Sequence, residues 1–133
     1  MFQLRIKGNP KGFKSSALAA ALRNLGRLPE QLGKVGIAIT AEIKRNLSGR
    51  ILQRRTGRLC DSWDWIIRAR NSGWDLVIGS DVVYARIHEF GGWTGAGHRT
   101  KIKRTRYVSR AVLAKKVQVQ RILRDYIARL FLR

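Results

Sequence analysis

The sequence predicts an α+β fold, with a small antiparallel sheet built around a central hairpin and packed against N-terminal helices and a long C-terminal helix. Three observations support this prediction. Residues 63–78 alternate between apolar and polar around a turn, residues 29–47 carry apolar side chains at helical spacing, and residues 110–130 do the same. The chain has 133 residues, 44% of them hydrophobic, so we expect one domain over residues 1–133 with a modest core.

The N-terminal part predicts a strand followed by two helices. Residues 2–6 alternate and place three apolar side chains on one face, as in a strand. A short helix capped by Ser15 or Ser16 is expected to end at Gly26. A second helix is expected from Pro29, which suits a first helical turn. Its core face is predicted from residues that recur every three or four positions: Leu32, Val35, Ile39, Ile43 and Leu47.

The middle of the chain predicts a β-hairpin after a polar, basic connector at residues 48–58. Trp63, Trp65 and Ile67 alternate before a turn at residues 71–73, and the alternation resumes at Trp74. We expect the three tryptophans of this hairpin to pack across strands in the core. Stacking on single-stranded nucleic acid is the functional alternative for them.

The last third predicts a short helix, a loop and a long helix. Residues 82–90 suit a short helix whose apolar side is formed by residues such as Tyr84, Ile87 and Phe90, with Tyr84 and His88 on one face. Residues 93–104 contain several glycines and basic residues and predict a mobile loop. A long amphipathic helix is expected from about Arg110.

The net charge of +20 comes from the two ends of the chain. Residues 1–60 hold 13 basic and 2 acidic residues, and residues 99–133 hold 12 basic and 1 acidic residue. Such charge predicts binding to a polyanion or to the acidic face of a protein partner, and charge alone leaves both open. No apolar run is long enough for a membrane span or a signal peptide, so we expect no membrane partner and synthesis in a reducing cytoplasm.

No group of residues suggests catalysis, a metal site or a cofactor. The two histidines have no zinc-like spacing with other ligands, and His88 is more simply a hydrogen-bonded residue that fixes the short helix. Asp61, Asp64 and Glu89 could be imagined as a Mg²⁺-binding nuclease cluster, but solvated hairpin charges are the simpler account. Cys60 has basic neighbours that could lower its pKa, yet a half-buried thiol is the simpler account. We therefore expect that the protein is not an enzyme and uses no cofactor or metal.

Two segments resemble the phage virion morphogenesis, or tail completion, family of tailed bacteriophages. The first is Thr56-Gly57-Arg58-Leu59, which stands just before the hairpin. The second runs from Gly79 to Gly92 and contains Tyr84, Ala85, His88, Phe90, Gly91 and Gly92 in a "GS-x-x-x-YA-x-x-H-x-FGG" pattern. The chain departs from the family in lacking a proline-rich turn before the last helix, since its last proline is Pro29.

The resemblance implies a structural role in the virion, at the junction of head and tail. Relatives complete or cap the tail tube and join it to the DNA-filled head, so the expected partners are tail-tube and neck (connector) proteins. A ring of identical copies is expected, with a hexamer favoured, and a transient contact with packaged DNA is conceivable. The residues expected to make contacts are those of the basic loop and its exposed aromatic: Trp93, Arg99, Lys101, Lys103 and Arg104. A sequence-nonspecific nucleic-acid-binding protein is the alternative function.

Overall fold

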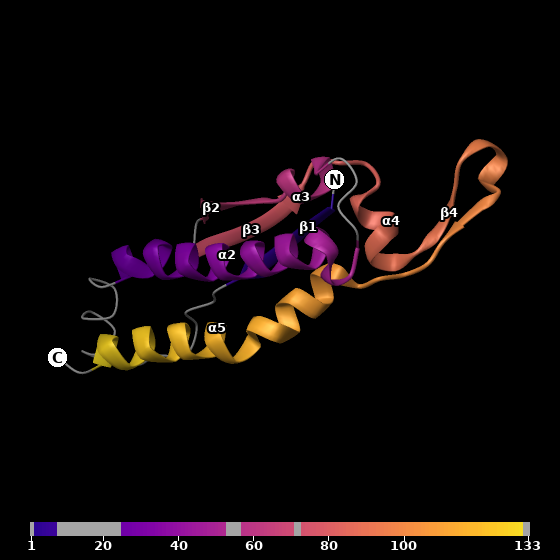
Figure 1. The fold of residues 1–133 in the computed structure, drawn as a ribbon. Coiled ribbons are helices and arrows are strands. Elements are labelled where there is room, and N and C mark those ends of the chain that lie inside the picture. Colours follow the sequence, from indigo (N-terminus) through magenta and orange to yellow (C-terminus); the bar gives the residue numbers. More distant parts are fainter. Residues whose placement is uncertain (1, 8–24, 53–56, 71–72, 132–133) are drawn as a thin grey trace.

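The computed structural model describes residues 2–7, 25–52, 57–70 and 73–131, and it confirms the α+β class. Three layers follow one another: a three-stranded antiparallel sheet, helix α2 (Leu28–Arg45), and helix α5 (Tyr107–Phe131) (Figure 1). Helix α5 packs on α2 rather than directly on the sheet. A thin two-stranded arm projects from one end of these layers.

The sheet has the order β1-β3-β2, and β3 is its central strand. The strands are β1 (Phe2–Lys7), β2 (Asp64–Arg70) and β3 (Gly73–Ser80), and both pairs are antiparallel. The predicted hairpin and the predicted N-terminal strand are thus confirmed. Because Trp65 lies opposite Ile78, and Ile67 opposite Leu76, the apolar residues of the alternating pattern share one face of the sheet.

Helix α2 covers that face, and its proline and apolar stripe lie where the sequence predicted them. Proline stands in its first turn, and all five residues of the predicted core stripe, from Leu32 to Leu47, are buried. Gly36 lets the helix approach the sheet closely. A Cβ atom there would lie 2.7 Å from the Trp65 ring, a distance that real contacts do not reach, so glycine at this position allows the indole to lie against the helix backbone.

The connection from α2 to the hairpin contains more structure than the predicted polar connector. A five-residue π turn, η2 (Asn46–Arg50), ends α2, and a short helix, α3 (Arg58–Asp61), precedes β2. Trp63 comes before β2 rather than within it, and it is 1% exposed. Its ring meets that of Tyr107 edge to face, with 5.8 Å between centroids, so it links the hairpin to the start of α5.

The N-terminal helix predicted between Ser15 and Gly26 lies almost wholly outside the described residues. The part that is described is a 3-10 turn, η1 (Leu25–Arg27), which leads into α2. Helix α5 begins at Tyr107, three residues before the predicted start. The apolar residues that recur at helical spacing along it predict a buried stripe: Val112, Val119, Ile122, Leu123, Tyr126, Ile127 and Leu130. All are half-buried or buried except Ile127, which is 47% exposed.

The prediction of a mobile loop over residues 93–104 was wrong. This segment forms strands β4 (Gly92–Thr94) and β5 (Thr100–Ile102), which pair antiparallel around a 3-10 turn, η3 (Ala96–His98). Backbone hydrogen bonds hold this glycine-rich segment as two strands, although its side chains do not alternate between apolar and polar as those of a buried strand would. We call residues 92–102 the arm.

Candidate functional site

The arm carries the aromatic residue that the sequence singled out. Trp93 on β4 lies directly opposite Lys101 on β5, so the two side chains share one face of the ribbon. The Lys101 ammonium lies 5.9 Å from the centre of the indole, within range of a cation–π contact. Trp93 nevertheless remains 57% exposed, which is unusual for the largest apolar side chain.

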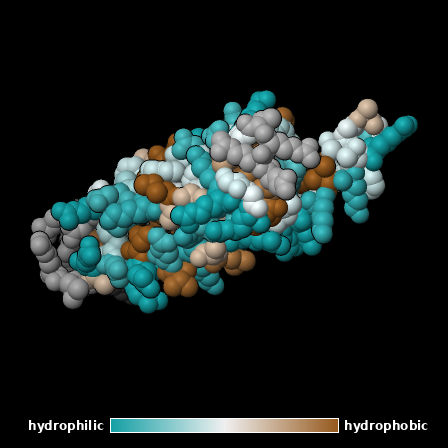
Figure 2. Space-filling view, viewed as in Figure 1, coloured by the Kyte–Doolittle hydropathy of each residue, from teal (hydrophilic) through white to brown (hydrophobic). Residues whose placement is uncertain are grey.

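The other residues of the predicted contact set lie in the arm or directly after it. Arg99 follows the tip of the turn, and Lys103 and Arg104 lie on the return path to the body, all three exposed. The structure therefore brings Trp93 and Lys101 together and spreads the remaining cations along the same projection. On the face seen in Figure 2 the arm is mostly hydrophilic to neutral in colour, and it stands clear of the body.

The base of the arm depends on Gly91. This residue has φ +75° and ψ 176°, a conformation that side chains strongly disfavour. A Cβ atom there would also lie 2.9 Å from the backbone nitrogen of Arg104, in the segment that returns from β5 to the body. Gly91 thus lets the outgoing and returning chains pass each other closely where the arm leaves the body.

Helix α4 (Ala85–Phe90), which precedes the arm, buries a different face from the one predicted. The predicted apolar side was wrong, because Tyr84 and Phe90 are exposed while Ala85 and Glu89 are buried. Phe90 is covered in part by the guanidinium of Arg86, 5.9 Å from its ring centre. The buried face of α4 is the one that contacts α5, through the Ala85 carbonyl and the Glu89 carboxylate.

Glu89 provides the most important of those contacts. It is 1% exposed, so the expectation of a solvated charge was wrong. Its carboxylate accepts the backbone N–H groups of Val108, at 2.8 Å, and Ser109, at 3.2 Å, and it also accepts the Ser109 hydroxyl. These donors belong to the first turn of α5, where N–H groups lack partners within the helix and where a negative charge is favoured.

Tyr107 joins the same junction from the other side. Its hydroxyl donates a 2.8 Å hydrogen bond to the carbonyl of Ala85. Burial raises the pKa of the Tyr107 phenol, and the nearby Glu89 carboxylate raises it further. Backbone bonds from Thr105 to the carbonyl of His88, and from Arg106 to that of Glu89, complete the turn into α5. Arg106 in this turn has φ +53°.

The remaining motif residues are placed around this junction or beside it. The rings of Tyr84 and His88 meet edge to face with 6.0 Å between centroids, as their spacing predicted. Gly57, with φ +81°, precedes α3, in which Arg58 is exposed and Leu59 is half-buried. Thr56 lies outside the described residues, and Gly92 (φ +148°) opens β4. Cys60 is buried beside the Ser48 hydroxyl rather than half-buried.

A second buried carboxylate, Glu42, connects the helices. It forms ion pairs with Arg45 at 3.0 Å, Lys115 on α5 at 3.7 Å, and Arg50 in η2. Burial by itself would raise the pKa of Glu42, but the three cations outweigh it and hold the pKa below its ordinary value. Three cations thus share one carboxylate at the seam between α2 and α5, and the group as a whole keeps a positive charge.

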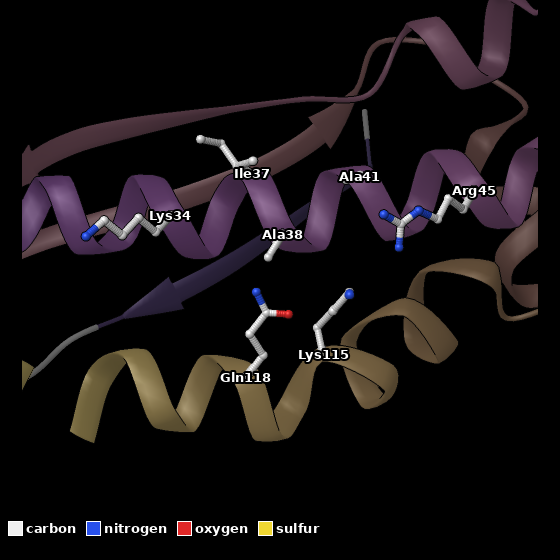
Figure 3. A pocket seen from close by; sticks show the side chains of 7 residues that line it. All are labelled: Lys34, Ile37, Ala38, Ala41, Arg45, Lys115 and Gln118. Atoms are coloured by element: carbon white, nitrogen blue, oxygen red, sulfur yellow. The ribbon is translucent and has the colours of Figure 1, made fainter. Parts of the chain in front are cut away.

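A shallow groove of about 320 Å³ runs beside this seam (Figure 3). It is lined by Ile37, Ala38 and Ala41 of α2, together with Lys34, Arg45, Lys115 and Gln118. The groove lacks the convergent polar groups of a small-molecule site.

Over the ranges that the structure describes, no three His, Cys, Asp or Glu residues come together as metal ligands would. In the same ranges, no helix has the length and apolar character to cross a membrane.

A known protein family matches the larger part of the chain. The model of the phage virion morphogenesis family matches residues 38–131, from the middle of α2 to the end of α5. The chain belongs to this family. The matched region includes the α4–α5 junction and the whole arm, so these features lie within the family's own domain. Comparison with curated proteins and with solved structures gave no match.

The family membership gives the chain a role in phage virion assembly and associates it with the virion and its structural proteins. The sequence-based prediction did not identify Glu89 as the buried cap of α5. It occupies the variable position between His88 and Phe90 in the motif, and its partner helix begins eighteen residues later. No local pattern marks such a cap. The nearest available signal was an acidic residue inside an apolar segment that is otherwise poor in charge.

Proposed function

We propose that the protein acts at the head–tail junction of the virion, where it completes the tail tube and joins it to the DNA-filled head. Its mechanism is complementary binding without a chemical reaction, and copies of the chain assemble into a ring. The observation that carries this proposal is the arm, a basic, projecting ribbon with an exposed tryptophan, which leaves the body beside a junction of α4 and α5 that a buried carboxylate stabilises. Aromatic residues and arginine, which the arm and its return path expose as Trp93, Arg99 and Arg104, are enriched at protein interfaces.

The rigid junction at the base of the arm supports an assembly role. The arm is attached to α5 through Glu89, Tyr107 and the constrained turn at Gly91, so its direction is fixed by the core rather than by solvent. An interface that must match a neighbour gains affinity when its contact residues are positioned before binding. Three of the family-motif residues, Ala85, His88 and Gly91, take part in this junction, and the contact residues lie beyond them.

The decisive experiment is electron microscopy of lysates from a phage that lacks the gene, complemented with variants. Without complementation we expect DNA-filled heads beside unjoined tails, and overlong tails if the protein also stops tube growth. The variant Trp93→Ala/Lys101→Ala is expected to give the same defect. The matched control Lys116→Ala/Arg121→Ala, which removes exposed cations from α5, is expected to restore joined particles.

Normal infectious particles without the gene would contradict the proposed function. They would favour the alternative, a free nucleic-acid-binding protein, whose affinity for DNA or RNA should fall steeply as salt is raised.

A further inference from the structure

We propose that the groove beside the seam of α2 and α5 is a docking site for an acidic amphipathic helix of another virion protein. Apolar side chains of α2 and cations of both helices line this groove. The inference goes beyond the proposed function, because it concerns a surface other than the arm. It requires only the role in virion assembly that the family membership gives.

Helix α2 has a second strip of side chains besides its buried stripe. The buried stripe packs in the core with the sheet. Lys34, Ala38, Ala41 and Arg45 follow one another at steps of four, three and four residues, so they lie in one line along the helix. All four line the groove. This spacing is the one by which a helix contacts another helix laid along it.

The middle of this strip is apolar and low. Ala38 and Ala41 are half-buried, and Ile37 beside them is 59% exposed. Small side chains allow a second helix to approach to an interaxial distance of about 8–10 Å. Figure 3 shows Lys115 and Gln118 extending from α5 towards α2, so α5 bounds one side of the groove. A helix laid along α2 here would cover Ile37 with its own apolar side chains.

Cations stand at the two ends of the apolar strip. Lys34 and Arg45 are separated by about 16 Å along the helix axis, at a rise of 1.5 Å per residue (Figure 3). Lys34 pairs with Glu30 at 3.8 Å, but both side chains are more than half exposed, so water and salt weaken this pair. A partner helix with acidic residues on both sides of an apolar strip would match this arrangement.

Positive charge is in excess at the Arg45 end of the groove. Arg45, Arg50 and Lys115 share the single carboxylate of Glu42. That carboxylate is buried, whereas the side chain of Arg45 is 58% exposed. An acidic side chain of a partner would therefore contact the cations rather than Glu42, and such charge complementarity favours one partner over others.

An acidic helix fits this surface better than a second copy or a nucleic acid does. Among the helices of the described ranges, each carries at most one exposed acidic residue, so another copy offers no acidic helix. Phosphates would pair with the cations, but a phosphate backbone has no apolar surface with which to cover Ile37. A helix with acidic residues on both sides of apolar ones complements both parts of the groove.

Photo-cross-linking during phage assembly identifies what occupies the groove. A benzophenone amino acid takes the place of Ile37, and in the matched control it takes the place of Leu113, which is 69% exposed on α5 outside the groove. Mass spectrometry of the cross-linked peptides identifies the partner segment. We expect position 37, but not position 113, to capture a segment of another virion protein in which acidic residues flank apolar residues at helical spacing.

Every other cross-linking result contradicts the inference. A second copy of the chain, a nucleic acid, or a segment without this pattern captured at position 37 would overturn it. The absence of any cross-link above that of the control would also overturn it.

A defined peptide tests the same chemistry with the purified protein. The probe has about 20 residues, enough for a helix to form, with leucines at helical spacing and glutamates on both sides of them. Because the protein carries +20, it attracts any acidic peptide, so a scrambled peptide of the same composition is the control. In calorimetric titrations at about 0.15 M salt, the wild type should bind the amphipathic peptide at least about tenfold more tightly than the scrambled one.

Two matched variants locate the binding. Lys34→Glu/Ile37→Ser changes the groove and should reduce the preference for the amphipathic peptide to less than about twofold. Leu113→Ser/Lys116→Glu makes the same chemical changes on α5 outside the groove and should keep the preference. Circular dichroism checks that both variants are folded. Equal binding of both peptides by the wild type, or an equal loss in both variants, would overturn the inference.

These outcomes are independent of the junction role. Unjoined heads and tails in the deletion, together with no specific cross-link at position 37, would refute the groove contact alone. Normal particles in the deletion, together with the expected cross-link, would refute the junction role alone.

Discussion

Replacing Glu89 by alanine should destabilise the protein more than almost any other single change. The carboxylate is buried and receives two backbone N–H groups and one hydroxyl from the first turn of α5. Hydrogen bonds to a charged group contribute about 1.5–3 kcal/mol each, and donors left without a partner in the interior add a desolvation cost. Some water will enter the space, so we expect a loss of about 3–5 kcal/mol, as for other broken buried charge contacts.

Glu89→Gln removes the negative charge but keeps the shape of the side chain, so it measures the contribution of the charge to stability. Its amide oxygen can still accept one backbone N–H, and its NH₂ group can donate to the Ser109 hydroxyl, so only one backbone donor is lost. We expect a loss of about 1–2 kcal/mol for this variant, from that donor and from the weaker interaction with the helix dipole. The control is Asp125→Ala, an exposed acid on the same helix, which should change stability by less than about 0.5 kcal/mol.

Urea unfolding followed by far-UV circular dichroism measures these differences, and hydrogen exchange locates them. The amides of Val108 and Ser109 should exchange much faster in Glu89→Ala than in the control. If Glu89→Ala and Glu89→Gln were equally stable, or if both lay within about 0.5 kcal/mol of the wild type, the carboxylate would not be the cap that fixes α5 to α4.

Three further predictions concern the arm, the helix seam and the sheet. Gly91→Ala should cost about 1–3 kcal/mol, because of its backbone conformation and the contact with the returning chain, whereas Gly26→Ala, which has open space, should be near neutral in the same urea titration. The free energy of unfolding should fall as the pH drops below 4.5, the ordinary pKa of a glutamate, because the pKa of Glu42 in the folded protein lies below this value. In Glu42→Gln the free energy of unfolding should depend less on pH over the same range. An unchanged slope would argue against the three ion pairs of Glu42. Gly36→Ala should cost about 1–3 kcal/mol by pushing α2 from the Trp65 ring, and a neutral result in thermal unfolding would mean that the helix can shift freely.

Much of the body could be predicted because its signals are local. The stripe of α2 repeats every three or four residues, and the hairpin alternates on both sides of its turn, so each pattern specifies an element and the face that it buries. Both predictions were confirmed. The family resemblance added the correct assignment to virion assembly through two short segments that flank the hairpin.

The arm and the α4 face could not be read in this way. Residues 93–104 have glycines and charges but no alternating apolar residues, because a ribbon that projects into solvent has no core side to mark it. In α4 and at its N-cap, the aromatic residues Phe90 and Tyr84 are exposed and a glutamate is buried, the reverse of the usual pattern. A buried carboxylate is acceptable there only because the first turn of α5 supplies its hydrogen-bond donors.

The sequence by itself determined the class of the fold, the core faces of α2 and the hairpin, the strongly basic character, and the family. Each of these depends on composition or on neighbours within one element. The tertiary structure decided that residues 92–102 project as an arm and that Glu89 caps a helix which begins far along the chain. These features depend on contacts between segments that are distant in the sequence. Only such contacts determine whether a given side chain is buried and which hydrogen-bond partners it has.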